Sequence, residues 1–180
     1  MINVYLADGF EEVEALTAVD VLRRAGIPVQ TVSITDDKMV RGTHDIYVQA
    51  DTVFADVDHN DCEMIVLPGG LPGAANLQDF KPLEEQIIAF AQGGKKLAAI
   101  CAAPMVFGEL GLLEGKNATI YPGMEEHLKG ANATDLAAVV DGNITTGKGP
   151  AFAMTFALTL VEVLQGEAKA SEVASGLLLK

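Results

Sequence analysis

One cysteine in this chain lies where a strand gives way to a helix, a setting typical of a reactive nucleophile. Cys101 follows four apolar residues, 97–100, and precedes Ala102, Ala103 and Pro104. A sharp turn between a buried strand and a helix presents such a side chain and leaves backbone N–H groups free for a ligand. The positive end of the helix dipole favours the thiolate, which is the reactive form. The alternative is a packed, inert thiol, because free cysteine often behaves as a small buried hydrophobe.

An acidic residue near the N-terminus is a candidate partner for this thiol. Glu11, Glu12 and Glu14 lie in or near the first turn of a helix expected over 11–25. Acidic side chains there usually face solvent and compensate the helix dipole, and we interpret Glu11 and Glu12 in this way. Glu14 lies at the start of the apolar face, so it either faces solvent or points inward. If it points inward, burial raises its pKa, and the protonated carboxyl could hydrogen-bond to a thiolate and transfer protons.

Two glycines follow another apolar run and could complete the same site. Gly69 and Gly70 come directly after Pro68, where an expected strand over 63–68 ends. They either form a plain turn or let backbone N–H groups approach a substrate oxygen, because no side chain blocks them. Together with the N–H group of Ala102 they could form an oxyanion hole.

Apolar runs that alternate with amphipathic segments predict the elements that position these residues. Strands are expected over 2–7, 28–34, 63–68, 96–100, 118–121, 138–141 and 144–146, with short extended pieces at 40–49 and 53–57. Helices are expected over 11–25, 82–92, 103–110, 150–164 and 167–176. This alternation predicts an α/β three-layer sandwich with a mostly parallel central sheet. Sites in such sheets form at the carboxyl ends of strands, so segments 8–14, 68–70 and 101–102 are expected to meet.

Composition sets limits on the class of protein. The length of 180 residues suits one domain over 1–180 with a full core. A net charge of −13 repels phosphate backbones, so no nucleic-acid partner is expected. The most apolar late segment, 151–164, contains polar residues and is too short to cross a bilayer, so no membrane partner is expected either.

The two cysteines and the missing motifs also restrict the chemistry. Cys62 and Cys101 form no CxxC pair, which fits a reducing, cytoplasmic location, and no signal peptide is expected. Cys62 begins a strand without an elbow and is interpreted as structural. His44 and His59 are interpreted as surface residues. No phosphate loop, GxGxxG fingerprint or metal-ligand spacing occurs, so neither a cofactor nor a metal is expected.

Four segments, taken in order over nearly the whole chain, resemble the ThiJ/PfpI superfamily. They are Asp8–Glu14, Val66–Gly70, Ala98–Pro104 and Gly147–Pro150. The most similar branch is that of the parkinsonism-associated deglycase and its bacterial relatives. The resemblance implies a flavodoxin-like sandwich, a homodimer, a nucleophilic Cys101 and a partner acid at Glu14. It also implies that the N–H groups of Gly70 and Ala102 face the ligand, with Gly149 and Pro150 as accessory positions.

Two departures from the family pattern bear on the reaction. Many members place a histidine before a proline near the cysteine, and this position is Tyr121 here, followed by Pro122. The frequent arginine of the closing segment is Lys148. Tyr121 thus becomes an accessory candidate, but it supplies no base for a peptidase-type Cys-His pair. His127 follows shortly and is a further accessory candidate, with a solvated side chain as the alternative.

The resemblance implies a cofactor-independent enzyme that acts on a small reactive carbonyl. The reaction would be glyoxalase III-type conversion of a 2-oxoaldehyde to a 2-hydroxy acid, or deglycation of early glycation adducts. The alternative is an oxidative-stress sensor or chaperone, in which Cys101 is oxidised and Glu14 hydrogen-bonds to the product. A cysteine peptidase or amidase is a third interpretation, and it lacks the histidine at position 121.

Overall fold

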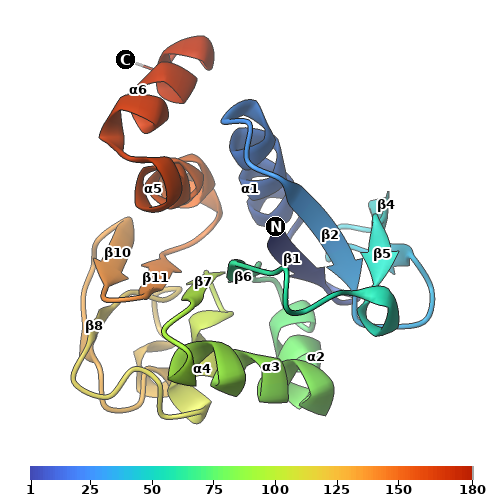
Figure 1. The fold of residues 1–180 in the computed structure, drawn as a ribbon. Coiled ribbons are helices and arrows are strands. Elements are labelled where there is room, and N and C mark those ends of the chain that lie inside the picture. Colours follow the sequence, from blue (N-terminus) through green and yellow to red (C-terminus); the bar gives the residue numbers. More distant parts are fainter. Residues whose placement is uncertain (180) are drawn as a thin grey trace.

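A seven-stranded sheet forms the middle layer of the structure, and helices cover both of its faces (Figure 1). The computed structural model describes residues 1–179. The strands lie in the order β10 (Ala138–Asp141), β11 (Ile144–Gly147), β7 (Lys96–Ile100), β6 (Met64–Leu67), β1 (Ile2–Leu6), β2 (Val29–Ser33) and β5 (Thr52–Val53). All neighbours are parallel except β10 and β11, which form an antiparallel pair. The predicted α/β sandwich with a mostly parallel sheet is therefore confirmed.

The helices divide between the two faces of the sheet. In Figure 1, α1 (Glu12–Arg24), α5 (Ala153–Gln165) and α6 (Glu167–Gly176) lie above the sheet, and α2 (Gly73–Asp79), α3 (Lys81–Gln92) and α4 (Pro104–Glu109) lie below it. Short 3-10 turns are η1 (Phe54–Asp56), η2 (Glu125–His127) and η3 (Pro150–Phe152). Two small sheets lie outside the main one, an antiparallel hairpin of β3 (Met39–Arg41) and β4 (Tyr47–Gln49), and a parallel pair of β8 (Asn117–Ala118) and β9 (Asn132–Ala133).

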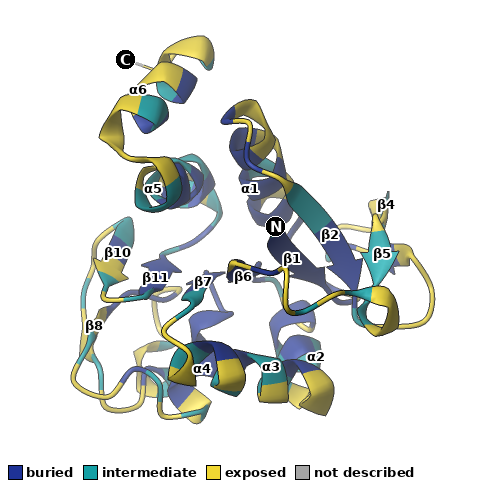
Figure 2. Ribbon diagram, in the orientation of Figure 1, coloured by how far each residue is buried: buried dark blue, intermediate teal, exposed yellow. Residues whose placement is uncertain are grey.

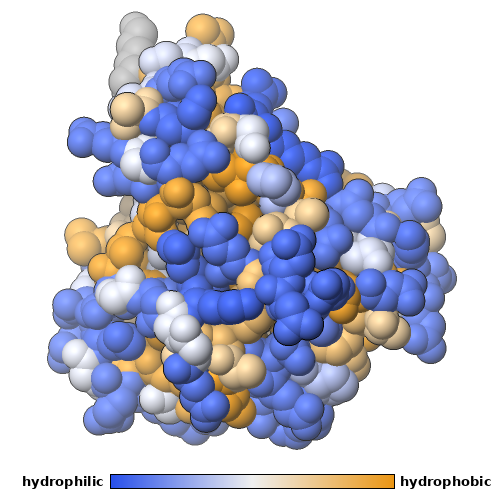
Figure 3. Space-filling view, viewed as in Figure 1, coloured by the Kyte–Doolittle hydropathy of each residue, from blue (hydrophilic) through white to orange (hydrophobic). Residues whose placement is uncertain are grey.

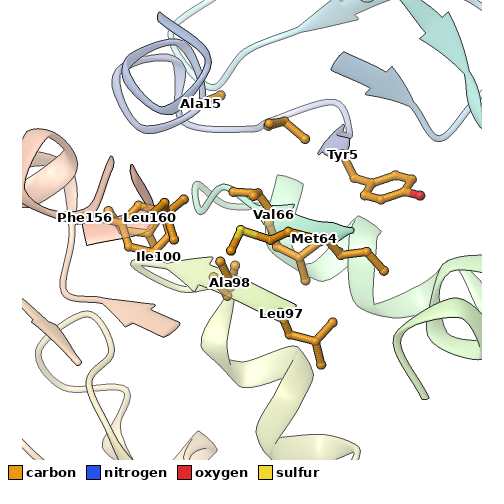
Figure 4. Packing of buried hydrophobic residues seen from close by; sticks show 14 of the residues in the cluster. Tyr5, Ala15, Met64, Val66, Leu97, Ala98, Ile100, Phe156 and Leu160 are labelled. Carbon is orange, nitrogen blue, oxygen red and sulfur yellow. The ribbon is translucent and has the colours of Figure 1, made fainter. Parts of the chain in front are cut away.

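Burial on both faces explains why the central strands read as continuous apolar runs. Every residue of β1 and β6 is buried, as expected for parallel strands covered by helices on both sides. Figure 2 shows the central strands buried and the outer faces of the helices exposed. Between sheet and helices, Ile100 of β7 lies beside Phe156 and Leu160 of α5 (Figure 4). Figure 3 shows that hydrophilic residues cover much of one face of the molecule, with hydrophobic residues gathered near α5.

Some predicted elements differ from the structure for identifiable reasons. Helix α2 was not expected, because its segment begins among the proline and glycine residues of 68–73. The strand expected over 118–121 is reduced to the two-residue β8 outside the main sheet. Its continuation turns toward the end of β7, where the Tyr121 N–H donates to the Cys101 carbonyl at 2.9 Å. No helix within residues 1–179 is long and apolar enough to span a membrane.

The prediction that Glu11 and Glu12 are solvated is wrong. Only 9% of Glu11 and 4% of Glu12 is exposed. The β3–β4 hairpin covers this end of α1, and the backbone N–H of His44 donates to Glu12 Oε1 at 2.8 Å. The hairpin is distant in sequence, so the local helix pattern carried no sign of it.

Candidate functional site

The sheet topology creates a crevice at the place where strand order reverses. From β1 the chain adds β2 and β5 on one side, and it adds β6, β7 and β11 on the other. Ligands in open α/β sheets bind at the carboxyl ends of strands beside such a reversal. Segments 8–14, 68–70 and 101–102 follow β1, β6 and β7 respectively. The structure therefore brings these three segments to one end of the sheet.

Cys101 lies in a strained turn immediately after β7. Its φ of 64° is in the left-handed region, which costs a non-glycine residue about 1–2 kcal/mol. Two backbone hydrogen bonds hold the turn: the Cys101 N–H donates to the Gly147 carbonyl, and its carbonyl accepts from Tyr121, both at 2.9 Å. Cys101 is 8% exposed. This geometry matches the elbow expected from the sequence and points to a functional constraint on the position.

Glu14 points inward from the first turn of α1, which decides between its two possible orientations. The residue is 1% exposed, and its Oε2 accepts the Gly69 N–H at 2.8 Å. Its Oε1 is buried and has no hydrogen-bond partner among residues 1–179. Burial of an ionised oxygen without a partner costs free energy, so Oε1 is more stable when it carries a proton or contacts a ligand.

Gly69 brings the thiol and the carboxyl together because it has no side chain. A Cβ atom at Gly69 would lie 2.5 Å from the Cys101 Cβ and 2.7 Å from Glu14 Oε2. At Gly70, where φ is 85°, a Cβ atom would lie 2.5 Å from the Glu11 backbone nitrogen. Both positions therefore require glycine. The side chains of Cys101 and Glu14, which could react, both lie against Gly69.

The pKa values of the two groups are coupled through this contact. Burial raises the pKa of Glu14 to about 7, against the effect of its hydrogen bonds with Cys101 and Gly69. Burial also raises the pKa of the Cys101 thiol to about 12, and the charge and hydrogen bond of Glu14 contribute to this. The sequence predicted the opposite direction for Cys101 from the helix dipole. The dipole is outweighed because α4 is only six residues long and begins three residues beyond the cysteine.

The same contact defines the reactive protonation state. An ionised Glu14 repels a thiolate, whereas a protonated Glu14 removes that charge and supplies a hydrogen-bond donor. Hydrogen bonds from the N–H groups of Gly70 and Ala102 lower the pKa of Cys101 and also favour the thiolate. A thiolate at Cys101 is therefore favoured only when Glu14 carries its proton, so the two groups titrate as a coupled pair.

Gly69 does not fill the oxyanion role that the sequence proposed for it together with Gly70 and Ala102. Its N–H group is already donated to Glu14 Oε2 at 2.8 Å. Hydrogen bonds from the N–H groups of Gly70 and Ala102 lower the pKa of Cys101, so these two groups stay the predicted donors for an oxyanion. Gly69 instead holds the carboxyl in position.

The accessory residues divide into one group beside the elbow and one residue apart from it. Tyr121, Gly149 and Pro150 line a hollow of about 290 Å³, together with Lys148 and Phe152. This hollow adjoins the elbow, because its lining residue Tyr121 donates its N–H to the Cys101 carbonyl.

The ring of His127 is not part of this group. Its Nε2 lies 4.0 Å from Glu126 Oε1, and no contact within residues 1–179 links the ring to Cys101. The described residues thus contain no Cys-His pair of the peptidase type.

Three residues near the site were missed as a group by the sequence reasoning. Glu11, Glu12 and His44 place a nitrogen and two carboxylate oxygens within 4.8 Å of one another. The two glutamates and the histidine are separated by more than thirty positions, and only the docking of the β3–β4 hairpin on α1 brings them together. No spacing in the sequence signals this.

Comparison with known proteins agrees with the fold and the placement of these segments. The profile of the DJ-1/PfpI family matches residues 1–163. The chain is 39% identical over 178 residues to protein dj-1beta of Drosophila melanogaster, covering 98% of this chain and 95% of that protein. It is also 42% identical over 177 residues to protein DJ-1 homolog B of Arabidopsis thaliana. That match covers 97% of this chain but only 40% of the plant protein.

Solved structures give the same result. A Toxoplasma gondii DJ-1 structure described as oxidized superposes with a TM-score of 0.95 at 35% identity, covering 99% of this chain and 97% of that one. Family profile, sequence identity and superposition all extend over the elbow, the Gly69–Gly70 turn and the start of α1. The chain therefore belongs to the DJ-1/PfpI family.

Proposed function

We propose that this protein is a cysteine-dependent, cofactor-independent enzyme that acts on reactive carbonyl compounds. The family includes deglycases and oxidative-stress proteins. The observation that carries the proposal is the buried Glu14 carboxyl, which lies across Gly69 from Cys101 and whose Oε1 has no hydrogen-bond partner within residues 1–179. A thiol, a proton carrier and two free amide donors at one point suit addition to a carbonyl followed by proton transfer.

The preferred reaction converts a 2-oxoaldehyde such as methylglyoxal to a 2-hydroxy acid. The Cys101 thiolate adds to the aldehyde carbon, and the resulting oxyanion, held by the N–H groups of Gly70 and Ala102, takes the proton from Glu14. The hemithioacetal then loses the proton on that carbon to the Glu14 carboxylate, which gives an enediolate with its negative charge on the neighbouring oxygen. The hydroxyl proton of the first carbon moves to that oxygen, Glu14 returns its proton to the neighbouring carbon, and the first carbon becomes the carbonyl of a thioester with Cys101. Water hydrolyses the thioester and restores the thiol. Deglycation of early glycation adducts is a related use of the same groups.

Replacement of Glu14 by glutamine tests this proposal. Glu14→Gln keeps a hydrogen-bond acceptor for Gly69 but cannot carry the proton, so kcat for lactate formation from methylglyoxal should fall by about 100-fold or more. His127→Ala is the matched control and should retain the parent rate, because its ring lies apart from the elbow. Circular dichroism establishes that both variants are folded. An undiminished rate in Glu14→Gln would contradict the proposal.

A second candidate function is oxidative-stress sensing through Cys101. The Toxoplasma relative has been solved in a form described as oxidized. Cys101 is 8% exposed, whereas Cys62 is 2% exposed and its sulfur donates to the Met64 carbonyl at 3.2 Å. Mild hydrogen peroxide should therefore oxidise Cys101 first, with protonated Glu14 hydrogen-bonding to the sulfinate. Peptide mapping by mass spectrometry checks the order, and earlier oxygen uptake by Cys62 excludes this role.

We further propose that the protein is a homodimer in the cytoplasm. Members of this family are commonly homodimers. Val13 and Leu16 on α1 are exposed apolar side chains, as are Ile46 and Tyr47 beside the hairpin. The Glu12–His44 hydrogen bonds hold these two elements against each other, and we infer that a second copy covers their exposed apolar side chains. The unpaired state of both cysteines supports a reducing compartment.

A further inference from the structure

The hollow beside the elbow has two walls that are both tied to the backbone of Cys101. Its volume is about 290 Å³, and it lies between segments 121–122 and 148–152. The Tyr121 N–H donates to the Cys101 carbonyl at 2.9 Å. The Cys101 N–H donates at 2.9 Å to the carbonyl of Gly147, the residue before the second segment. The turn that presents the thiol therefore also fixes both walls of the hollow.

Rings make up most of the lining of this hollow. They belong to Tyr121, Pro122, Pro150 and Phe152. A Cβ atom at Gly149 would lie 3.4 Å from Tyr121 Cδ2, so the tyrosine ring packs beside the glycine backbone. Tyr121 is nevertheless 47% exposed, which leaves part of its ring free for another contact. Such a lining suits an apolar or aromatic group of a ligand.

The ammonium group of Lys148, the cation in the described lining, is already engaged. Its Nζ pairs with Asp135 Oδ1 and lies 5.5 Å from the centroid of the Phe152 ring. Only 17% of the lysine side chain is exposed. An ammonium that already pairs with a carboxylate attracts a second anion less strongly. The apolar rings, and not this charge, therefore decide which substituent the hollow accepts.

We propose that this hollow binds the substituent of the 2-oxoaldehyde, and that the Tyr121 ring selects an aryl substituent such as the phenyl group of phenylglyoxal. This inference rests on the proposed carbonyl reaction and narrows its substrate class. A methyl group leaves most of the hollow unfilled, whereas a phenyl ring fills more of it and gains a contact between aromatic rings. The aryl group is attached to the ketone carbon, so the thiolate still adds to the aldehyde carbon. Phenylglyoxal and water then give mandelate by the steps already described.

Initial rates with phenylglyoxal and methylglyoxal test the proposal. Tyr121→Ala should lower the ratio of kcat/KM for phenylglyoxal to kcat/KM for methylglyoxal by about tenfold, the scale on which an apolar pocket discriminates. The intrinsic reactivity of each aldehyde cancels in this comparison. Tyr121→Phe keeps the ring and should retain the parent ratio. His127→Ala, whose ring lies apart from the elbow, is the matched control and should retain the ratio as well. An unchanged ratio in Tyr121→Ala, or an equal loss in Tyr121→Phe, overturns the inference.

A binding measurement separates this inference from the proposed reaction. In Cys101→Ser, which lacks the thiolate, calorimetry should show tighter binding of mandelate than of lactate, because the two acids differ only in the phenyl and methyl groups. Addition of Tyr121→Ala to this variant should remove the difference, and circular dichroism establishes that both proteins are folded. If the parent converts neither aldehyde, the proposed reaction fails and the preference for mandelate still decides the role of the hollow. Equal affinities for the two acids, or a preference that survives Tyr121→Ala, overturn the inference even where methylglyoxal is converted.

Discussion

Glu14 and Cys101 form a buried pair in which burial raises the pKa of both groups. The carboxyl has little solvent around it, so its pKa is raised from 4.5 to about 7. The thiol is disfavoured as an anion when that carboxyl is charged. The proposed chemistry therefore depends on a group whose ionisation the native fold opposes, which is a common arrangement in active sites.

This shift predicts a pH-dependent stability effect. Because the folded-state pKa of Glu14 lies above its unfolded value, the native state binds the proton more tightly, and stability falls as pH rises from about 4.5 to 7. Glu14→Gln lacks this group, so it should gain stability relative to the parent by about 3 kcal/mol at pH 8, and by little at pH 4.5. Urea denaturation at both pH values measures the difference. Glu85→Gln, at an exposed carboxylate, is the control. A difference that does not change with pH would contradict the assigned pKa.

At this scale the sequence predicted which residues lie together at the candidate site but not their electrostatics. The elbow at Cys101 is a local pattern of apolar and small residues, and local patterns are readable. The position of Glu14 at the start of the apolar helix face allowed an inward orientation, and the structure decided between inward and outward. The direction of the Cys101 pKa was wrong because burial and the neighbouring carboxyl depend on the packing of distant segments.

Among the elements, the loop after β6 controls how closely the site can assemble. Gly69 separates Cys101 from Glu14 and donates its N–H to the carboxylate. A single added methyl group would lie within 3 Å of both side chains and of the Ile100 carbonyl. The loop therefore leaves room between the two side chains for glycine and for no larger residue.

Substitution of this glycine should disable the site without touching either reacting side chain. Gly69→Ala should lower kcat for the proposed carbonyl reaction by about 100-fold, the scale of losing a positioned acid or base, and should also lower the thermal midpoint because backbone atoms must move. Gly176→Ala is the matched control, since among the described residues no atom beyond its chain neighbours and its own helix backbone lies within 4 Å of the added Cβ. Steady-state kinetics and thermal denaturation of both variants check this. Parent-like activity in Gly69→Ala would contradict this prediction and show that the loop shifts to accommodate the added methyl group.

Elements with strong periodicity were predictable, and those made by long-range packing were not. The central strands and helices α1, α3 and α5 follow runs of apolar residues that the sequence displays. Helix α2 and the shortened β8 depend on the loop after β6 and on the elbow, so local propensity misjudged both. The docking of His44 on Glu12 has the same origin, since it joins residues 32 positions apart.

For the whole molecule, the formal charge of −13 per chain opposes the proposed self-association. Two like-charged copies repel each other, and dissolved salt screens this repulsion. The apolar surface around Leu16 and Tyr47 must therefore supply the attraction between copies. The repulsion between like charges and the attraction between apolar surfaces can both be tested by measuring the dimer at several salt concentrations and in surface variants.

Introduction of a charge on this surface should separate the copies. Leu16→Glu should shift the protein from dimer to monomer in analytical ultracentrifugation, because it buries a carboxylate in an apolar contact. Leu136→Glu, at an exposed apolar residue outside this surface, should leave the dimer intact. Raising the salt concentration should strengthen the parent dimer. A parent that is monomeric at all concentrations, or a Leu16→Glu protein that remains dimeric, contradicts the proposed interface.

The left-handed backbone at Cys101 sets stability against activity at a single position. Glycine adopts this conformation without steric strain, so Cys101→Gly would relax the turn at the moment it removes the sulfur. A lineage freed from the need for a thiol would find this change favourable and would have little reason to reverse it. A cysteine in such a turn therefore indicates a need for the sulfur, and glycine at this position in a relative would mark a protein that has lost the chemistry and kept the fold.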